Sequence, residues 1–131
     1  MIFRYTILYV KNVSASLDFY ERAFGFSRLF LHEAGDYGEL STGDTKLAFS
    51  SIELMQQLGK NPASPVAASP TFELAFESDN VQSDLERAVN AGAELVQELR
   101  EEPWGQSTSY VSDPDGYLIE ICSVVQLPNP G

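Results

Sequence analysis

The feature of this sequence that most constrains its fold is an internal repeat. The segment 12–17 reads Asn-Val-Ser-Ala-Ser-Leu and the segment 80–85 reads Asn-Val-Gln-Ser-Asp-Leu, with Asn, Val and Leu in the same places. An acidic residue follows each segment, and a glycine (Gly25 or Gly92) comes after it. Self-similarity of this kind is typical of two structural units with the same order of elements. The chain therefore predicts two related halves.

Each copy is predicted to form a strand, a helix and then three strands. Runs rich in β-branched and aromatic residues indicate the strands, and apolar residues at helical spacing indicate the helices. Asn12 or Ser14 can cap the first helix, and the two repeat glycines end the helices. The expected strands cover 3–10, 27–33, 37–41 and 46–50 in the first copy, and 71–77, 94–99, 107–112 and 117–123 in the second. Asp113-Pro114-Asp115-Gly116 predicts a tight turn.

These elements predict an α+β fold: two βαβββ modules that form a cupped, mostly antiparallel eight-stranded sheet. The first module is expected over 1–50, a proline-containing linker over 51–70, the second module over 71–123 and a C-terminal tail over 124–131. One or two helical turns are expected at 52–58. The two modules together are expected to make one domain.

The alternation of side chains along a strand predicts which residues enter the cup. In the first module these are Tyr5, Ile7 and Tyr9; in the second they include Glu73, Glu120 and Cys122, with Ala48 as the counterpart of Glu120. Their alternate neighbours are expected to face the helix, namely Thr6, Leu8 and Val10, Leu47 and Phe49, Phe72, Leu74 and Phe76, and Ile119 and Ile121. Apolar residues at helical spacing mark the side of each helix that packs on its sheet, namely Leu17, Tyr20, Ala23 and Phe24 in the first and Val81, Leu85, Ala88 and Val89 in the second.

Composition and charge exclude several classes of function. The 131 residues carry 8 Lys and Arg against 19 Asp and Glu, a net charge of −11. Neither nucleic acid nor an anionic membrane is an expected partner of such a chain. Cys122 is the single cysteine, so a disulfide within the chain and a multi-cysteine metal site are excluded. No apolar run is long enough for a membrane span, and the cytoplasm is the expected compartment.

At this point the sequence resembles the vicinal oxygen chelate superfamily, which includes glyoxalases, bleomycin resistance proteins and extradiol dioxygenases. The resemblance rests on the segments 13–20, 25–26, 74–81 and 110–120, the last with its Asp-Pro-Asp-Gly turn leading to Glu120. It covers essentially residues 2–123. In metal-dependent members the ligands lie on the first, fourth, fifth and eighth strands, and these positions correspond to Tyr5, Ala48, Glu73 and Glu120.

Only Glu120 keeps the ligand type that the resemblance implies. The alanine has no ligating atom, and both histidines of the usual set are missing. We therefore expect no metal site built from this set and no cofactor, although two carboxylates with waters could hold Mg²⁺ or Mn²⁺ weakly. His32, the single histidine, lies away from these positions and is expected at the surface.

The predicted catalytic residues are Glu73 and Glu120, and the predicted ligand-binding residues are Tyr5, Tyr9, Trp104, Gln106 and Tyr110. The two carboxylates suit either acid–base chemistry or recognition of a ligand amine; alternatively, they are a relic pair satisfied by water and polar neighbours. Tyr110 is either a ligand contact or a core residue, and Trp104 is either a lid over the pocket or a plug between modules. A buried, unreactive thiol is expected at Cys122.

Three functional hypotheses follow. In the first, the protein binds a small organic ligand with aromatic and cationic parts in the cup, as in the bleomycin-resistance type. In the second, it is a divalent-metal-dependent glyoxalase-like lyase or dioxygenase that uses Glu120 and Glu73. In the third, its own side chains fill the pocket and its role is structural. A small-molecule ligand is the expected partner in the first two, and the family resemblance implies a homodimer with each pocket near the subunit interface.

Overall fold

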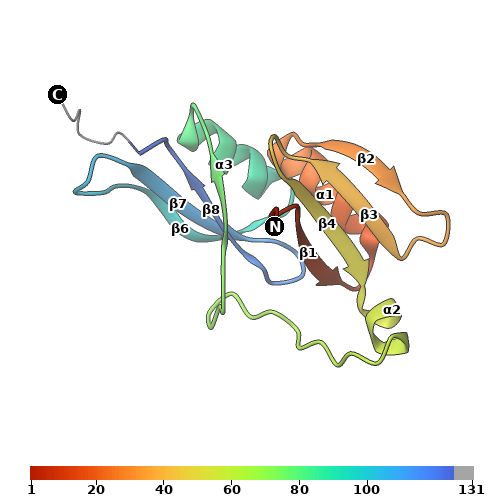
Figure 1. The fold of residues 1–131 in the computed structure, drawn as a ribbon. Coiled ribbons are helices and arrows are strands. Elements are labelled where there is room, and N and C mark those ends of the chain that lie inside the picture. The colour runs from red at the N-terminus through yellow and green to blue at the C-terminus, as the bar shows by residue number, and fades with distance from the viewer. Residues whose placement is uncertain (126–131) are drawn as a thin grey trace. The chain divides into compact units, whose positions relative to one another are not determined.

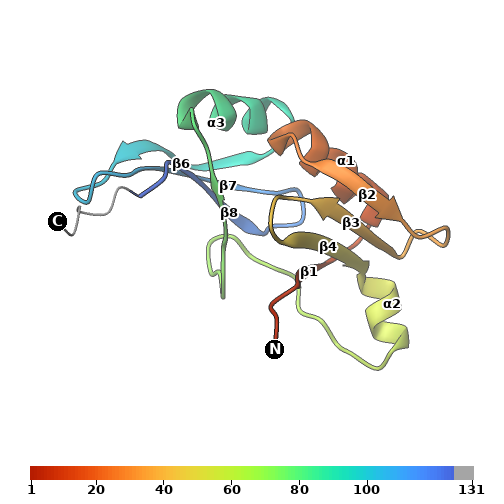
Figure 2. The same ribbon diagram turned by 45° about the horizontal axis from the view of Figure 1, so that its top comes forward.

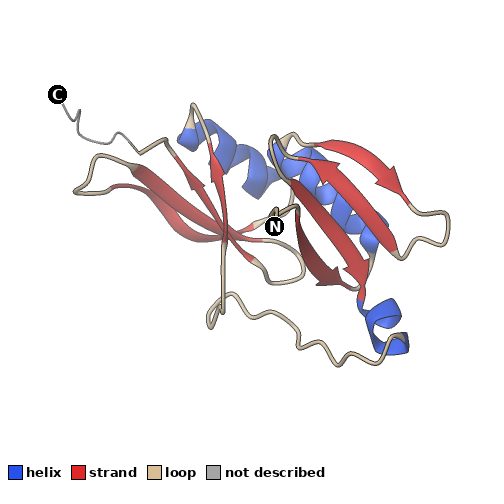
Figure 3. Ribbon diagram, in the orientation of Figure 1, coloured by secondary structure: helices blue, strands red, loops and turns tan. Residues whose placement is uncertain are grey.

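The computed structural model describes residues 1–125, and it divides the chain into two compact units, Met1–Ser64 and Pro65–Gly131. Figure 1 shows the order of elements and Figure 3 their type. The first unit contains β1 (Tyr5–Val10), α1 (Val13–Phe24), β2 (Ser27–Leu31), β3 (Tyr37–Ser41), β4 (Lys46–Ser51) and the short α2 (Ile52–Gln57). The second contains β5 (Leu74–Glu77), α3 (Val81–Asn90), β6 (Glu94–Glu101), β7 (Ser107–Ser112) and β8 (Leu118–Cys122).

The repeated asparagine begins the long helix of each unit. The side chain of Asn12 accepts a hydrogen bond from the backbone N–H of Ala15 at 3.0 Å, and Asn80 accepts one from Ser83 at 3.1 Å. An asparagine at this position satisfies an N–H group that the helix itself leaves unpaired. Of the two caps that the sequence allowed for the first helix, the structure selects Asn12.

Each unit forms a 4-stranded sheet with its long helix against one face. The strand orders are β1-β4-β3-β2 and β5-β8-β7-β6, so the two sheets have the same topology. In each, the first strand pairs in parallel with the last, and the other pairs are antiparallel. Figure 2 shows α3 along its sheet. The predicted α+β fold of two βαβββ modules is confirmed, and its eight strands lie in two hydrogen-bonded sheets of four.

The buried core of each unit lies between helix and sheet. In the first unit, Leu17 and Tyr20 of α1 are almost fully buried together with Leu8 and Phe49 of the sheet, and the ring centres of Tyr20 and Phe49 lie 5.0 Å apart. Burial of such side chains contributes about 1.5–3 kcal/mol each. In the second unit, Leu85 and Ala88 of α3 lie over Ile119 and Ile121 of β8. These are the helix-facing residues that strand alternation predicted.

Several predicted strands differ from the observed ones at their ends. β1 begins at Tyr5 rather than residue 3, and β5 begins at Leu74 rather than residue 71. The reason is that β1 and β5 each pair with one neighbour, and that pairing starts only where β4 or β8 is present. Phe72, predicted on the helix-facing side of that strand, therefore precedes it and is exposed, with its ring 6.0 Å from that of Tyr117. β6 extends to Glu101, beyond its predicted end.

The predicted linker, 51–70, contains α2, and the division between the units falls within it. Part of the predicted tail lies outside the described residues. No helix among residues 1–125 is long and apolar enough to cross a membrane.

Candidate functional site

Strand pairing in the second unit gathers polar side chains on the face of the sheet away from α3, which we call the acidic face. Its residues are Glu73, Tyr110, Glu120, Cys122 and Gln106. Tyr110 of β7 pairs directly with Glu120 of β8, and Thr108 pairs with Cys122. Because side chains alternate across a strand, these residues share one face while Ile119 and Ile121 face the helix.

A short hydrogen bond joins the central pair of the acidic face. The Tyr110 hydroxyl donates to Glu120 Oε2 at 2.8 Å. Burial, then the hydrogen bond and charge of Glu120, and then the charge and hydrogen bonding of Glu73, raise the pKa of Tyr110 well above its ordinary value. The phenol therefore stays neutral at physiological pH and acts as a donor to the carboxylates. Three of the predicted site residues are thus brought together.

The same face continues through a thiol and an amide. Cys122 is buried, and burial, followed by hydrogen bonding to Glu120, raises its pKa to about 11. A thiol held so far from ionisation at neutral pH is a poor nucleophile, as the sequence predicted. Gln106 hydrogen-bonds Cys122 as well, and its amide donates to the carbonyl oxygen of Ser123 at 3.0 Å.

Trp104 is anchored to this face by its indole nitrogen while its ring stays accessible. Its Nε1 donates to Gln106 Oε1 at 2.7 Å, and the residue is 56% exposed. Since Gln106 is itself held by the residue that follows β8, the tryptophan has a fixed polar end and a free apolar surface. That arrangement leaves the ring free to stack against a ligand, and both interpretations of Trp104 from the sequence stay predictions.

The second unit contains few positive charges to balance this face. Residues 65–131 include twelve acidic side chains and two arginines, Arg87 and Arg100. Arg87 lies on α3, on the other side of the sheet. Arg100 pairs with Glu102 at 2.7 Å and lowers the pKa of that carboxyl. Within the described part of this unit, no ion pair reaches Glu73 or Glu120.

The first unit has a comparable cluster that sequence reasoning missed. The Tyr37 hydroxyl donates to Glu39 Oε2 at 2.8 Å, and burial together with Glu39 raises the pKa of Tyr37. Lys46 Nζ lies 3.7 Å from Glu39 Oε1 and 5.5 Å from the centre of the Tyr5 ring. The available signal was strand alternation: Tyr37 and Glu39 are two residues apart on one strand and so share a face.

The remaining predicted site residues lie in the first unit. Tyr9 has Lys60 Nζ at 3.4 Å from its hydroxyl and 5.6 Å from its ring centre. Ala48 is fully buried beside Ile7 and Glu39 in the strand register. His32 follows the edge strand β2, where its Nδ1 accepts from Ala34 N at 3.1 Å and lies 3.6 Å from Asp36. Its side chain is 56% exposed, so its predicted place at the surface is confirmed.

The strand registers support the predicted equivalence between modules. Ala48 pairs with Ile7, and Glu120 pairs with Ala75, so Tyr5 and Glu73 occupy matching places two residues earlier. The four positions therefore form two matching pairs, one in each module, and their correspondence to the superfamily's ligand positions stays a prediction from the resemblance.

The donors at those positions do not fit a resident transition metal. Ala48 has no donor atom, no imidazole is present among the four, and Glu120 accepts a hydrogen bond from Tyr110. Nitrogen or thiolate ligands are what tight zinc, nickel or iron sites use. Residues 1–125 contain no group of three or more His, Cys, Asp or Glu side chains placed to hold a metal ion.

Comparisons with known proteins agree with this architecture. The chain is 25% identical to an uncharacterized protein of Mycobacterium bovis over 84% of this chain and 75% of that one. A glyoxalase-related enzyme from Fulvimarina pelagi has a similar structure, with a TM-score of 0.81, 25% identity and coverage of 94% of this chain and 88% of that chain.

A glyoxalase/bleomycin resistance protein/dioxygenase family enzyme from Burkholderia phytofirmans has a TM-score of 0.78 and 25% identity, covering 92% of this chain and 96% of that one. The model of the glyoxalase-like domain matches residues 3–126, nearly the whole sequence. With its two βαβββ modules and this match, the chain belongs to the glyoxalase-like domain family.

Proposed function

We propose that this protein binds a small organic cation on the acidic face of the second unit. The observation that carries the proposal is the joined set of Glu120, Tyr110 and Glu73, in a unit whose charged partners lie elsewhere. Glu120 is partly buried and Glu73 is exposed, and among the described residues of this unit neither forms an ion pair, so the two carboxylates favour a positively charged group from solution. A protonated or quaternary amine supplies that charge.

The surrounding residues give the ligand a shape as well as a charge. The indole of Trp104 offers an exposed aromatic surface, and aromatic faces attract cations by about 0.5–2 kcal/mol. Tyr110 holds the Glu120 carboxylate in one orientation, so less side-chain freedom is lost on binding. A cationic aromatic compound matches this combination. In this proposal, Glu73 and Glu120 are binding residues rather than an acid and a base.

The test compares tryptamine, which is protonated at pH 7, with tryptophol, its neutral alcohol counterpart. Isothermal titration calorimetry should detect tryptamine binding and much weaker tryptophol binding. Glu120→Gln should weaken tryptamine binding about tenfold, because it removes a half-buried carboxylate while keeping the acceptor for Tyr110. Glu94→Gln is the control, since it makes the same change of net charge at the start of β6. Equal binding of both compounds, or equal effects of both variants, would refute the proposal.

A second experiment, a titration with divalent metal ions, distinguishes the proposed cation binding from the metal-dependent alternative. Chelator-treated protein is heated with Mg²⁺ or Mn²⁺, and the proposal expects no saturable rise in Tm. A ligand at about 100 times its Kd stabilises a fold by roughly 2.7 kcal/mol, which is several degrees for a chain of this size. A rise that disappears in Glu120→Gln would replace the proposed cation-binding role by a metal-dependent one.

A further inference from the structure

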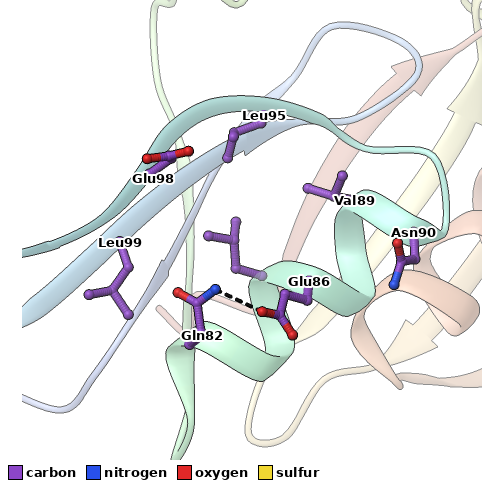
Figure 4. A pocket seen from close by; sticks show the side chains of 8 residues that line it. Gln82, Glu86, Val89, Asn90, Leu95, Glu98 and Leu99 are labelled. Atoms are coloured by element: carbon purple, nitrogen blue, oxygen red, sulfur yellow. Dashed lines mark hydrogen bonds between the residues drawn. The ribbon is translucent and has the colours of Figure 1, made fainter.

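The second unit contains a cavity on the opposite side of its sheet from the acidic face. It has a volume of about 640 Å³ and lies between α3 and β6, which we call the α3–β6 groove. The residues that the argument uses are Leu85, Glu86 and Val89 of α3, and Leu95, Glu98 and Leu99 of β6 (Figure 4). Cavities of about 300–1,000 Å³ are the size that small molecules occupy.

The helix contributes a regular stripe to this groove. Its lining residues between Gln82 and Asn90 are spaced by three and four positions, so they lie along one side of α3. Leu85 forms the buried floor, but Val89, predicted from its spacing to belong to the core, is 39% exposed. The apolar stripe of α3 is therefore wider than the sheet beneath it covers.

An irregularity in β6 supplies the other wall. The pairing of β6 with β7 shifts register between Leu95 and Gln97 and again between Gln97 and Arg100. Gln97 turns to the far side, where its amide donates to Thr108 Oγ1 at 3.2 Å. Because a bulge interrupts strict alternation, Glu98 can share the groove with Leu95 and Leu99.

The groove combines an apolar floor with negative charge at its rim. Glu86 accepts a hydrogen bond from Gln82 at 2.9 Å, and Glu98 has no hydrogen-bond or ion-pair partner in the described part of the chain. Among the described residues, no lysine or arginine lines the groove. The unit around it has ten more acidic than basic residues, so its field favours a positive occupant.

We propose that the α3–β6 groove is a second binding site, for an amphipathic organic cation with an aliphatic body and a single ammonium head. The body lies against Leu85, Val89 and Leu95, and the head lies beside Glu98. The same charge argument disfavours a dimer in which the groove packs against the same groove of a second copy of the chain, because their acidic rims would repel each other. The site is independent of the acidic face and of the function proposed for it.

The test uses decyltrimethylammonium below its micelle concentration, with decyl sulfate as the anionic compound of equal chain length. Amide chemical shifts in ¹⁵N-labelled protein locate the binding. We expect saturable changes at 82–99 with the cation, smaller changes at 110 and 120, and no saturable change with the sulfate.

Glu98→Gln should raise the Kd for the cation about three- to fivefold, the size expected for a partly exposed ion pair. Glu94→Gln is the matched control on the same strand, and it should change the Kd by less than about 1.5-fold because it acts on the site only from a distance. Val89→Lys places a competing ammonium group in the groove and should abolish binding.

Three results would overturn the proposal. The first is equal binding of both surfactants, which would indicate adsorption by chain length alone. The second is an equal loss in the Glu98 and Glu94 variants. The third is the absence of saturable shifts at 82–99, which includes the case where another protein chain covers the groove. In Glu120→Gln, the Kd obtained from the shifts at 82–99 should stay unchanged while any shifts at 110 and 120 are reduced, so failure here and failure of the acidic-face proposal are distinguishable.

Discussion

The two modules share a tyrosine–carboxylate hydrogen bond of 2.8 Å, but they build it differently. In the first module, Tyr37 and Glu39 lie two residues apart on β3. In the second, Tyr110 and Glu120 lie opposite each other on β7 and β8. The strand registers show which positions correspond. Glu39 pairs with Ala48 in the first module, and Tyr110 pairs with Glu120 in the second, so Glu39 matches Tyr110 and Ala48 matches Glu120. The carboxylate lies on a different strand in each module, while the hydrogen bond is common to both.

The balance of charge then separates the two modules. Lys46 lies beside Glu39 and over the Tyr5 ring, so the first carboxylate has an internal counter-ion. The second carboxylate has a phenol as its hydrogen-bond partner and a further carboxylate, Glu73, acting on that phenol. One module therefore balances its carboxylate with a lysine of its own, and in the other we propose that a ligand cation supplies that charge.

The largest expected difference between modules lies in their cores. Leu17→Ala should reduce the free energy of unfolding by about 3–5 kcal/mol, and Leu85→Ala at the matching place by about 2–3 kcal/mol. Leu17 is fully buried, whereas Leu85 borders the α3–β6 groove, where neighbours can relax. Urea unfolding followed by circular dichroism measures both values. A greater loss for Leu85→Ala would contradict the comparison.

Trp104 fluorescence, followed in the same titrations, reports on the second unit because the chain has one tryptophan. A Leu17→Ala midpoint that falls equally by fluorescence and by circular dichroism would show that the modules unfold together.

The next contrast concerns the turn before the last strand of each module. Gly43 and Gly116 both have positive φ, at 112° and 104°. A Cβ at Gly43 would meet nothing within 4 Å, but one at Gly116 would lie 2.7 Å from the carbonyl oxygen of Pro65. Gly43→Ala should cost about 1–2 kcal/mol from backbone strain, and Gly116→Ala about 1–3 kcal/mol more from the clash. Thermal unfolding of both variants checks the order, and equal Tm losses would show that Pro65 moves away easily.

The smallest effect tests what the modules share. Both tyrosines have pKa values above the ordinary 10.0, so above pH 10 the unfolded chain releases protons that the folded chain retains. The free energy of unfolding should therefore be at its full value below pH 10 and fall as pH rises beyond it. Tyr37→Phe and Tyr110→Phe should each reduce that fall by less than about 1 kcal/mol between about pH 10 and 11, since solvent screens both groups.

Urea unfolding at about pH 9, 10 and 11 measures this dependence on both sides of the ordinary tyrosine pKa. Tyr9→Phe is the control, because Tyr9 belongs to neither of the two tyrosine–carboxylate pairs. An unchanged slope in one of the two test variants would show that its hydrogen bond does not persist in solution.

Much of the fold could be predicted because local signals and the repeat agreed. The repeated segments marked where both helices begin, although the structure decided for Asn12 over Ser14 as the first cap, and the spacing of Leu17 and Leu85 identified the buried sides of the helices. Parity along the strands was sufficient to predict that Tyr110 and Glu120 share one face. The same alternation places Tyr37 and Glu39 on one face of β3. However, no known motif identifies these two residues as a site, and their partner Lys46 comes from the next strand.

The sequence by itself determined the two modules, their helices and the faces of most strands, because periodicity depends on neighbouring residues, whereas the structure decided between Asn12 and Ser14 as the first cap. Only the tertiary structure decided where charges are balanced, since Lys46 reaches Glu39 across a strand pair. It also decided the shape of the α3–β6 groove: the pairing of β6 with β7 shifts register twice, Glu98 lines the groove together with Leu95, and Val89 is exposed. Such shifts arise from pairing between strands, which has no signature in the order of residues along one of them.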